Sequence, residues 1–204
     1  LTNIQDSHLK KKWKKVFADV ANAYRLGMDD EELYIPNLEG EAYNSVDELY
    51  YRIFSNLSPL SMCVTHITTP AGKMNGSNCY NYGLGKLYNK GYNAILCSSL
   101  SGDVNGCSYN NMNGNALLKN GAILFAHGQL WGYPNILVDV NGEAKPNVVG
   151  RDMFIILIRD GKVIPGGAPG YELKGCDKKI ASRANHDAEN LSGSGCGYKY
   201  LIEK

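Results

Sequence analysis

The feature that most constrains the fold is the N-terminal stretch of residues 1–28, which contains no proline and whose single glycine lies close to its end. Apolar side chains recur there at intervals of three and four residues, while charged side chains occupy the other positions. This pattern predicts an amphipathic helix that ends near Gly27 as a C-cap. The apolar stripe consists of Trp13, Val16, Phe17, Val20, Ala21 and Tyr24, and Leu1 and Ile4 continue it.

The apolar stripe needs a partner, and most of the sheet signal lies after residue 116. Segments 121–126, 135–140 and 153–159 are short, rich in Ile, Leu, Val and Phe, and bounded by Gly, Pro and Asn. Asn141-Gly142 and Asp160-Gly161 are strong signals for type I′ hairpin turns, because these residues tolerate positive φ angles. We therefore predict an α+β fold in which a long N-terminal helix packs on an antiparallel sheet built from residues 117–166.

The rest of the chain is expected to complete a single domain of residues 1–204. Ser45 and Glu48 form a capping-box pattern that opens a second helix over residues 45–57. Segments 62–67 and 198–202 are candidate edge strands. The Asn-, Gly- and Tyr-rich residues 68–115 are interpreted as a surface insertion, and residues 167–204 as a cysteine-bounded C-terminal region.

The chain has six cysteines and no C-x-x-C pair, a composition that favours three disulfides over a zinc site. Disulfides indicate an oxidising compartment, so we expect an extracytoplasmic location. Six cysteines allow 15 pairings, and free buried thiols are the alternative. The pairings that close the most local loops are Cys63 with Cys79, Cys97 with Cys107, and Cys176 with Cys196.

The charge and hydropathy of the chain limit which classes of partner it is expected to bind. A net charge of +1 argues against a nucleic-acid-binding protein, and no run of about 18 apolar residues is present that could span a membrane. The basic block Lys10, Lys11, Lys12, Lys14 and Lys15 would suit a position near a phospholipid surface, or it is a solvated helix face. Because the helical pattern has no cap signal before Leu1, we expect the helix to continue upstream.

Residues 139–154 follow the pattern D-x-N-G-x-x-x-P-N-x-x-G-x-D-x-F, after a Leu-Lys-Asn-Gly-Ala-Ile segment at 118–123 and before a Gly-Lys-Val-Ile-Pro-Gly segment at 161–166. With the cysteine-bounded end of the chain, this block resembles the C-terminal part of bacterial type IV pilin-like proteins and type II secretion pseudopilins. The resemblance closely covers about a quarter of the chain.

The resemblance implies a non-enzymatic role in which subunits assemble into a helical filament through their N-terminal helices. It implies homo-oligomeric or other pilin-subunit partners, and attachment to the membrane before assembly through an apolar helical segment upstream of Leu1. It also fits a helix from Trp13 to Tyr24 that packs on an antiparallel sheet, and disulfides that keep an exposed head intact.

A calcium ion is the only cofactor that the sequence suggests. The oxygens of Asp139, Asn141 and Asp152 could surround it, because D-x-N-G places two short acceptors on one turn and Asp152 ends the same loop. Related pseudopilins resemble this in having a calcium-stabilised C-terminal loop. The alternative is an Asx-turn and a hairpin that need no metal.

Two other functions have weaker support. Trp131, Tyr133 and the tyrosines of residues 75–115 would suit a host-protein or glycan ligand, as in a secreted adhesin, although tyrosines also fill small cores. Cys107, His127 and Asp139 could form a cysteine-hydrolase constellation, but no local motif supports it, and His8, His66 and His186 are dispersed. Residues 83–86 lack the remaining spacing of a phosphate loop, and we interpret them as a turn.

Overall fold

The computed structural model describes residues 2–28, 43–64, 94–98, 104–108, 112–130, 133–142, 144–171, 173, 175–176 and 193–203. In residues 2–3, 43–45, 94–98, 104–108, 112–113 and 127–130 it describes the backbone alone. The elements in chain order are α1 (Thr2–Met28), α2 (Tyr43–Asn56), β1 (Ser61–Val64), β2 (Ala94–Ser98), β3 (Val104–Ser108), β4 (Met112–Leu117), β5 (Ile123–Leu130), β6 (Tyr133–Asp139), β7 (Met153–Arg159), β8 (Lys162–Pro165) and α4 (Cys196–Ile202).

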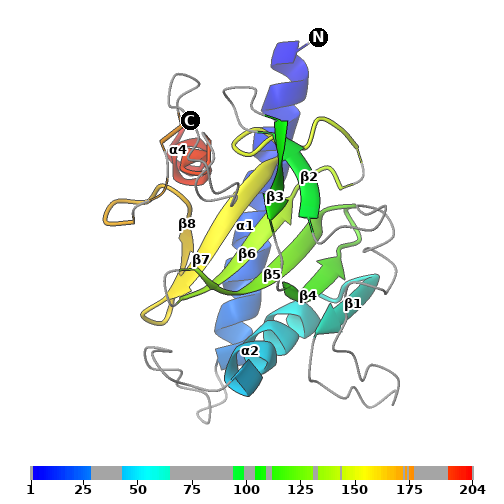
Figure 1. Cartoon of the computed structure of the whole chain (residues 1–204), viewed down its shortest axis with the longest axis vertical. Helices are drawn as coiled ribbons and strands as arrows, with labels where there is room; N and C mark the ends of the chain where they lie inside the picture. The colour runs from blue at the N-terminus through cyan, green and yellow to red at the C-terminus, as the bar shows by residue number, and fades with distance from the viewer. Residues whose placement is uncertain are drawn as a thin grey trace.

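A six-stranded antiparallel sheet in the order β1-β4-β5-β6-β7-β8 forms the centre of the domain, and β2 and β3 form a separate two-stranded sheet. In Figure 1, α1 runs behind the six-stranded sheet, and the β2–β3 hairpin lies in front of it. The predicted α+β class with an antiparallel sheet and an N-terminal helix is therefore confirmed.

The amphipathic pattern of α1 explains how it packs. Leu9, Trp13, Val16, Val20 and Tyr24 are buried, whereas the charged positions between them stay wholly or partly exposed. Ile4 departs from the prediction, because its side chain is 76% exposed near the projecting N-terminal end of the helix. The stripe meets the sheet from Leu9 onward, and the first turns of α1 extend past the sheet (Figure 1).

Trp13 is the central contact of this interface. Its ring is fully buried and stacks on Phe154 of β7, with 4.6 Å between ring centroids. Its Nε1–H donates a hydrogen bond to the carbonyl oxygen of Gly197 at 2.9 Å. One side chain of α1 thereby joins the sheet and the C-terminal segment.

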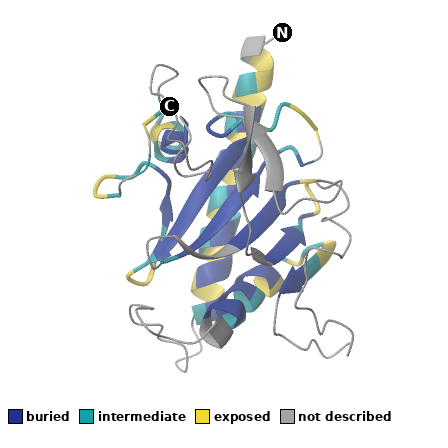
Figure 2. Ribbon diagram, viewed as in Figure 1, coloured by how far each residue is buried: buried dark blue, intermediate teal, exposed yellow. Residues whose placement is uncertain are grey.

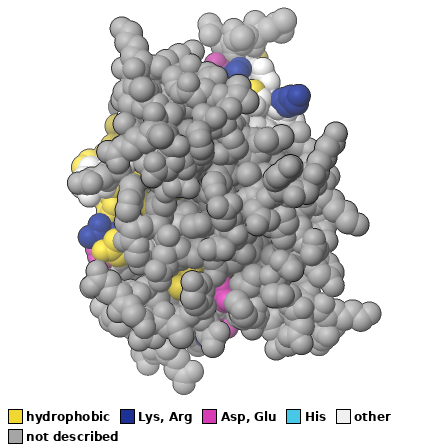
Figure 3. Space-filling view, in the orientation of Figure 1, with side chains coloured by type: hydrophobic (Ala, Val, Ile, Leu, Met, Phe, Trp, Pro, Cys, Tyr) yellow, Lys and Arg dark blue, Asp and Glu magenta, His cyan; other side chains and the backbone are white. Residues whose placement is uncertain are grey.

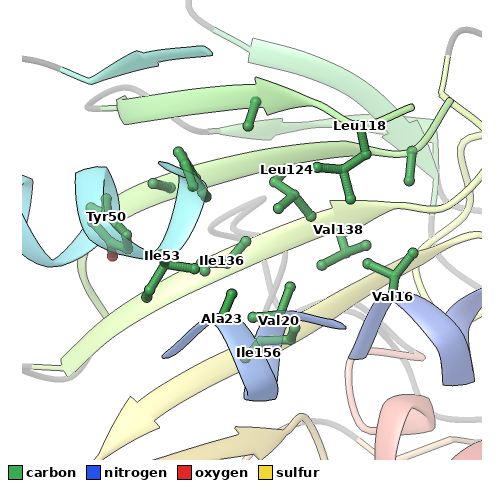
Figure 4. Packing of buried hydrophobic residues seen from close by; sticks show 14 of the residues in the cluster. Val16, Val20, Ala23, Tyr50, Ile53, Leu118, Leu124, Ile136, Val138 and Ile156 are labelled. Carbon is green, nitrogen blue, oxygen red and sulfur yellow. The ribbon is translucent and has the colours of Figure 1, made fainter. Parts of the chain in front are cut away.

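Helix α2 packs on the same side of the sheet as α1. Tyr50, Ile53 and Phe54 are buried in the core cluster to which Val20 and Ala23 of α1 also belong (Figure 4). The Tyr50 hydroxyl accepts a hydrogen bond from the backbone N–H of Asn135 and donates one to its carbonyl oxygen. Burial raises the pKa of Tyr50 far above its usual range, so the hydroxyl remains protonated.

Both faces of the six-stranded sheet are buried, which the consecutive buried positions along β6 and β7 reflect (Figure 2). Leu124, Ile136 and Ile156 point toward α1 and α2 (Figure 4), and neighbouring positions form a second cluster on the opposite face. The second cluster contains Ile123, Phe125, Leu137, Val149, Met153, Ile155, Leu157 and Ile164.

The C-terminal segment corrects one prediction. Residues 198–202 were expected to form an edge strand, but Cys196–Ile202 is a short helix, α4. Its Tyr200 ring meets Phe154 edge-on, 5.9 Å between centroids, and Lys10 of α1 lies 4.2 Å from the centroid of the Tyr200 ring. These tertiary contacts outweigh the weak strand preference of a short aromatic-rich segment.

The disulfide between Cys176 and Cys196 is confirmed, and it ties α4 to the segment that follows β8. Cys63 is also disulfide-bonded, to a partner whose side chain lies outside the described residues. Cys79 and the side chains of Cys97 and Cys107 lie outside them as well, so the other two pairings stay predictions.

Several predicted boundaries and turns differ in the structure. Gly27 does not cap α1; the helix continues to Met28, and a Cβ at Gly27 would lie 3.2 Å from Cβ of Arg52, so this glycine permits a close approach of α2. Helix α2 begins at Tyr43, which places Ser45 inside the helix and not at its N-cap. Of the predicted strand 62–67, Ser61–Val64 is an edge strand and residues 65–67 lie outside the described residues.

The sheet also extends beyond the predicted core of residues 117–166. It includes β1, and β4 begins at Met112, inside the segment interpreted as an insertion. The rest of 68–115 that is described is the β2–β3 hairpin. The strand predicted from residue 121 begins at Ile123, because Gly121 has a φ of 83° in the turn between β4 and β5.

Candidate functional site

The three residues predicted to bind calcium lie at the two ends of one loop, which connects β6 to β7. Asp139 is the last residue of β6, and Asp152 precedes the first residue of β7. Both side chains are completely buried. The N–H of Val140 donates to the carbonyl oxygen of Asp152 at 2.9 Å, so the ends of the loop are closed against each other.

Asp139 shapes the first turn of the loop. Its Oδ1 accepts hydrogen bonds from the backbone N–H groups of Asn141 at 3.2 Å and Gly142 at 2.9 Å, which is an Asx-turn. Only Gly142 of the pair has a positive φ, 64°, and β7 begins eleven residues later, at Met153. The type I′ hairpin predicted at Asn141-Gly142 is therefore wrong, whereas Asp160 and Gly161, with φ of 50° and 70°, form the predicted tight turn between β7 and β8.

Asp152 holds the second half of the loop. Its Oδ1 accepts a hydrogen bond from the N–H of Val148 at 2.6 Å, and its Oδ2 accepts one from the N–H of Asn147 at 2.8 Å. Burial raises the pKa of Asp152 above its ordinary value, and the hydrogen bonds from the two backbone amides and from Asn141 oppose that shift. The Asp152 carboxylate thus accepts the hydrogen bonds of two backbone amides that would otherwise lack an acceptor inside the loop.

This arrangement bears on the predicted calcium ion. Three carboxylate oxygens of Asp139 and Asp152 face backbone amides of their own loop, and Nδ2 of Asn141 donates to the carbonyl oxygen of Ala144 at 2.8 Å. Oδ1 of Asn141 is buried and has no hydrogen-bond partner among the described residues. Within that part of the chain, no group of three or more His, Cys, Asp or Glu residues is placed to hold a metal. The loop is held by protein hydrogen bonds as it stands, and the calcium site stays a prediction.

Replacing Asp152 with alanine is expected to lower the free energy of unfolding by about 2 kcal/mol, because two backbone N–H groups lose their acceptor inside the fold. Chemical denaturation of the isolated chain measures this change. Asp19→Ala is the matched control, since Asp19 is a partly exposed carboxylate on α1 and its loss should change stability by less than about 0.5 kcal/mol. Equal effects of the two substitutions would contradict a structural role for Asp152.

The sheet register bears on the hydrolase constellation. His127 of β5 lies opposite Asn135 of β6, and Asp139 lies opposite Ile123. Four residues along a strand correspond to about 13 Å, so His127 and Asp139 are too far apart for a direct hydrogen bond. Cys107 belongs to the separate β2–β3 sheet, and its side chain and that of His127 lie outside the described residues.

The aromatic residues proposed to bind a ligand are only partly described. The guanidinium of Arg159 lies over the ring of Tyr133, 4.3 Å from its centroid, and 5.6 Å from the centroid of Tyr171. One face of the Tyr133 ring is therefore already covered. Trp131, the tyrosines at 80, 82, 88 and 92, Tyr109 and the turn at 83–86 lie outside the described residues, as do His66 and His186.

Sequence reasoning missed the contacts between the β6–β7 loop, α4 and the first turns of α1. Arg151 forms an ion pair with Asp6 at 2.9 Å, and Lys10 forms one with Glu203 at 2.8 Å. Nζ of Lys14 donates to the carbonyl oxygen of Glu203. No local sequence pattern predicts these contacts, because the two residues of each pair are 145 or more positions apart in the sequence.

Comparisons of the chain with protein-family models, curated proteins and solved structures found no match. Among the described residues, no helix combines the length and the apolar character needed to cross a bilayer.

Proposed function

We propose that the chain is the head domain of a membrane-anchored, pilin-like subunit that assembles into an extracellular type IV pilus-like filament or a type II secretion pseudopilus. Its role is structural and not enzymatic, and its partners are copies of itself or other pilin-like subunits. The observation that carries this proposal is the two-sided character of α1, a 27-residue helix. At 1.5 Å per residue it is about 40 Å long, and it is buried on one side only.

The exposed side of the C-terminal half of α1 has a position at which another helix could approach closely. Ala18 and Asn22 lie on one face, four residues apart, and both are exposed. Ala18 gives this face a small side chain near its middle, which permits a close approach of another helix. A subunit that buries its globular head against one side of the helix keeps the other side available for the filament.

Two further features support the proposal. Residues 139–154, the block that carries the resemblance, include the loop that Asp139 and Asp152 stabilise by accepting hydrogen bonds from its backbone amides. The C-terminal disulfide suits a head that remains outside the cytoplasm after assembly. The proposal places the chain in the periplasm or on the cell surface.

The test uses the full-length gene product, expressed with its secretion machinery and carrying a single added cysteine. Ala18→Cys should react with a maleimide reagent in the isolated domain and be protected in sheared filaments, because α1 faces other subunits there. Lys162→Cys on β8 is the matched control, since Lys162 is exposed on an element other than α1 and should react in both states.

Three results would contradict the filament proposal. One is secretion of the full-length product as a free monomer after removal of a cleavable signal peptide, which favours the alternative of an adhesin or glycan-binding module. The second is formation of filaments in which Ala18→Cys reacts as fast as Lys162→Cys. The third is hydrolase activity that is lost when Cys107 is replaced.

A further inference from the structure

The N-terminal half of α1 presents a concentrated positive charge. The helix has six basic and two acidic residues, so it carries +4 in a chain whose net charge is only +1. Lys11, Lys12 and Lys15 lie within two turns of each other, and Lys11 and Lys15 are exposed while Lys12 is partly exposed. Figure 3 shows basic side chains at the end of the molecule where the N-terminus lies.

The described acidic side chains near these lysines are already paired. Asp6 contacts Arg151 at 2.9 Å, Glu203 contacts Lys10 at 2.8 Å, and Asp19 contacts Lys15 at 3.2 Å. Lys11 and Lys12 have no carboxylate partner among the described residues. These three carboxylates are therefore neutralised locally, and the described part of this end keeps an excess of positive charge.

The same face carries an exposed apolar side chain. Ile4 precedes Lys11 by seven residues, which places the two side chains two turns apart on one face. The Ile4 side chain is 76% exposed, the largest exposed fraction among the exposed large hydrophobic residues of the described chain. An apolar side chain beside a cluster of lysines is the combination found on helices that bind membrane interfaces.

We propose that this basic end, formed by Ile4, Lys11, Lys12 and Lys15, binds the headgroups of an anionic phospholipid bilayer. Phosphate groups of the bilayer would pair with the lysines that lack a carboxylate partner, and Ile4 would enter the interfacial region. The attraction acts within about 8 Å of the surface at physiological salt. This binding does not require filament assembly, so it can be tested on the chain alone.

The experiment measures co-sedimentation of the chain with vesicles of phosphatidylcholine, with or without phosphatidylglycerol. The chain is expected to bind only the vesicles that contain phosphatidylglycerol, and to be released by high salt. The variant Lys11→Gln, Lys12→Gln should bind roughly 30-fold more weakly, given the usual contribution of each lysine near an anionic surface.

The matched control is Arg25→Gln, Lys162→Gln, which removes the same charge from the C-terminal end of α1 and from β8, and it should bind like the unchanged chain. Circular dichroism checks that all three proteins are folded. Absence of binding to phosphatidylglycerol vesicles, or equal losses in both variants, would overturn the proposal. Self-association without vesicles that Lys11→Gln, Lys12→Gln abolishes would also overturn it, since the basic end would then bind a second copy.

Discussion

Replacing Trp13 with alanine is expected to lower the free energy of unfolding by about 4 kcal/mol. The indole is fully buried, stacks on Phe154 and donates to the carbonyl oxygen of Gly197. Its removal leaves a cavity between α1, β7 and the start of α4, together with a buried carbonyl oxygen that has lost its donor. Chemical denaturation followed by far-UV circular dichroism gives the change in free energy.

Trp13→Phe serves as the control that separates volume from hydrogen bonding. A phenyl ring can keep most of the contact with Phe154 but cannot donate to Gly197, so we expect a loss of about 1.5 kcal/mol. Ala18→Gly, on the exposed side of α1, should cost about 1 kcal/mol through helix propensity alone. A Trp13→Ala effect no larger than that of Ala18→Gly would mean that α1 does not pack on the sheet as described.

Removing the disulfide between Cys176 and Cys196 is expected to lower the free energy of unfolding by about 3 kcal/mol, because the bond closes a loop of 20 residues. The double variant Cys176→Ala, Cys196→Ala measures this without leaving an unpaired thiol. The contact between α4 and α1 should also loosen. Cys196 is buried at the start of α4, and the next residue, Gly197, accepts the hydrogen bond from Trp13 of α1.

Hydrogen exchange distinguishes this local effect from general destabilisation. Amides of α4 and the N–H of the Trp13 indole should exchange faster in the double variant, whereas amides in β5 and β6 should change only as far as global stability falls. Uniform loss of protection over all elements would contradict a role of the disulfide in holding α4 on the sheet.

The elements that the sequence predicts well are those whose signal is local. The stripe from Trp13 to Tyr24 has a helical period over several turns, and Asp160-Gly161 needs only two residues to set its turn, so both predictions are confirmed. Asn141-Gly142 carries the same kind of turn signal as Asp160-Gly161. It forms a different turn because Asp139 accepts hydrogen bonds from both of its amides.

The parts that were not predicted depend on partners far away in the sequence. Residues 198–202 are short and aromatic-rich, and their helical state is set by packing of Tyr200 on Phe154 and Lys10. In the candidate site, spacing alone brought Asp139, Asn141 and Asp152 to one loop. The Asp152 carboxylate accepts hydrogen bonds from the amides of Asn147 and Val148 because the loop backbone folds back toward it. No sequence motif predicts this backbone conformation.

The long-range bonds of α1 have a consequence for how the protein is made. The partners of Asp6, Trp13 and Lys10 lie 145, 184 and 193 residues further along the chain. The apolar side of α1 is therefore translated well before the last of the residues that cover it, even though α2 follows soon after. Until those residues have been synthesised, part of that apolar side has no partner, and premature release of the chain would favour aggregation.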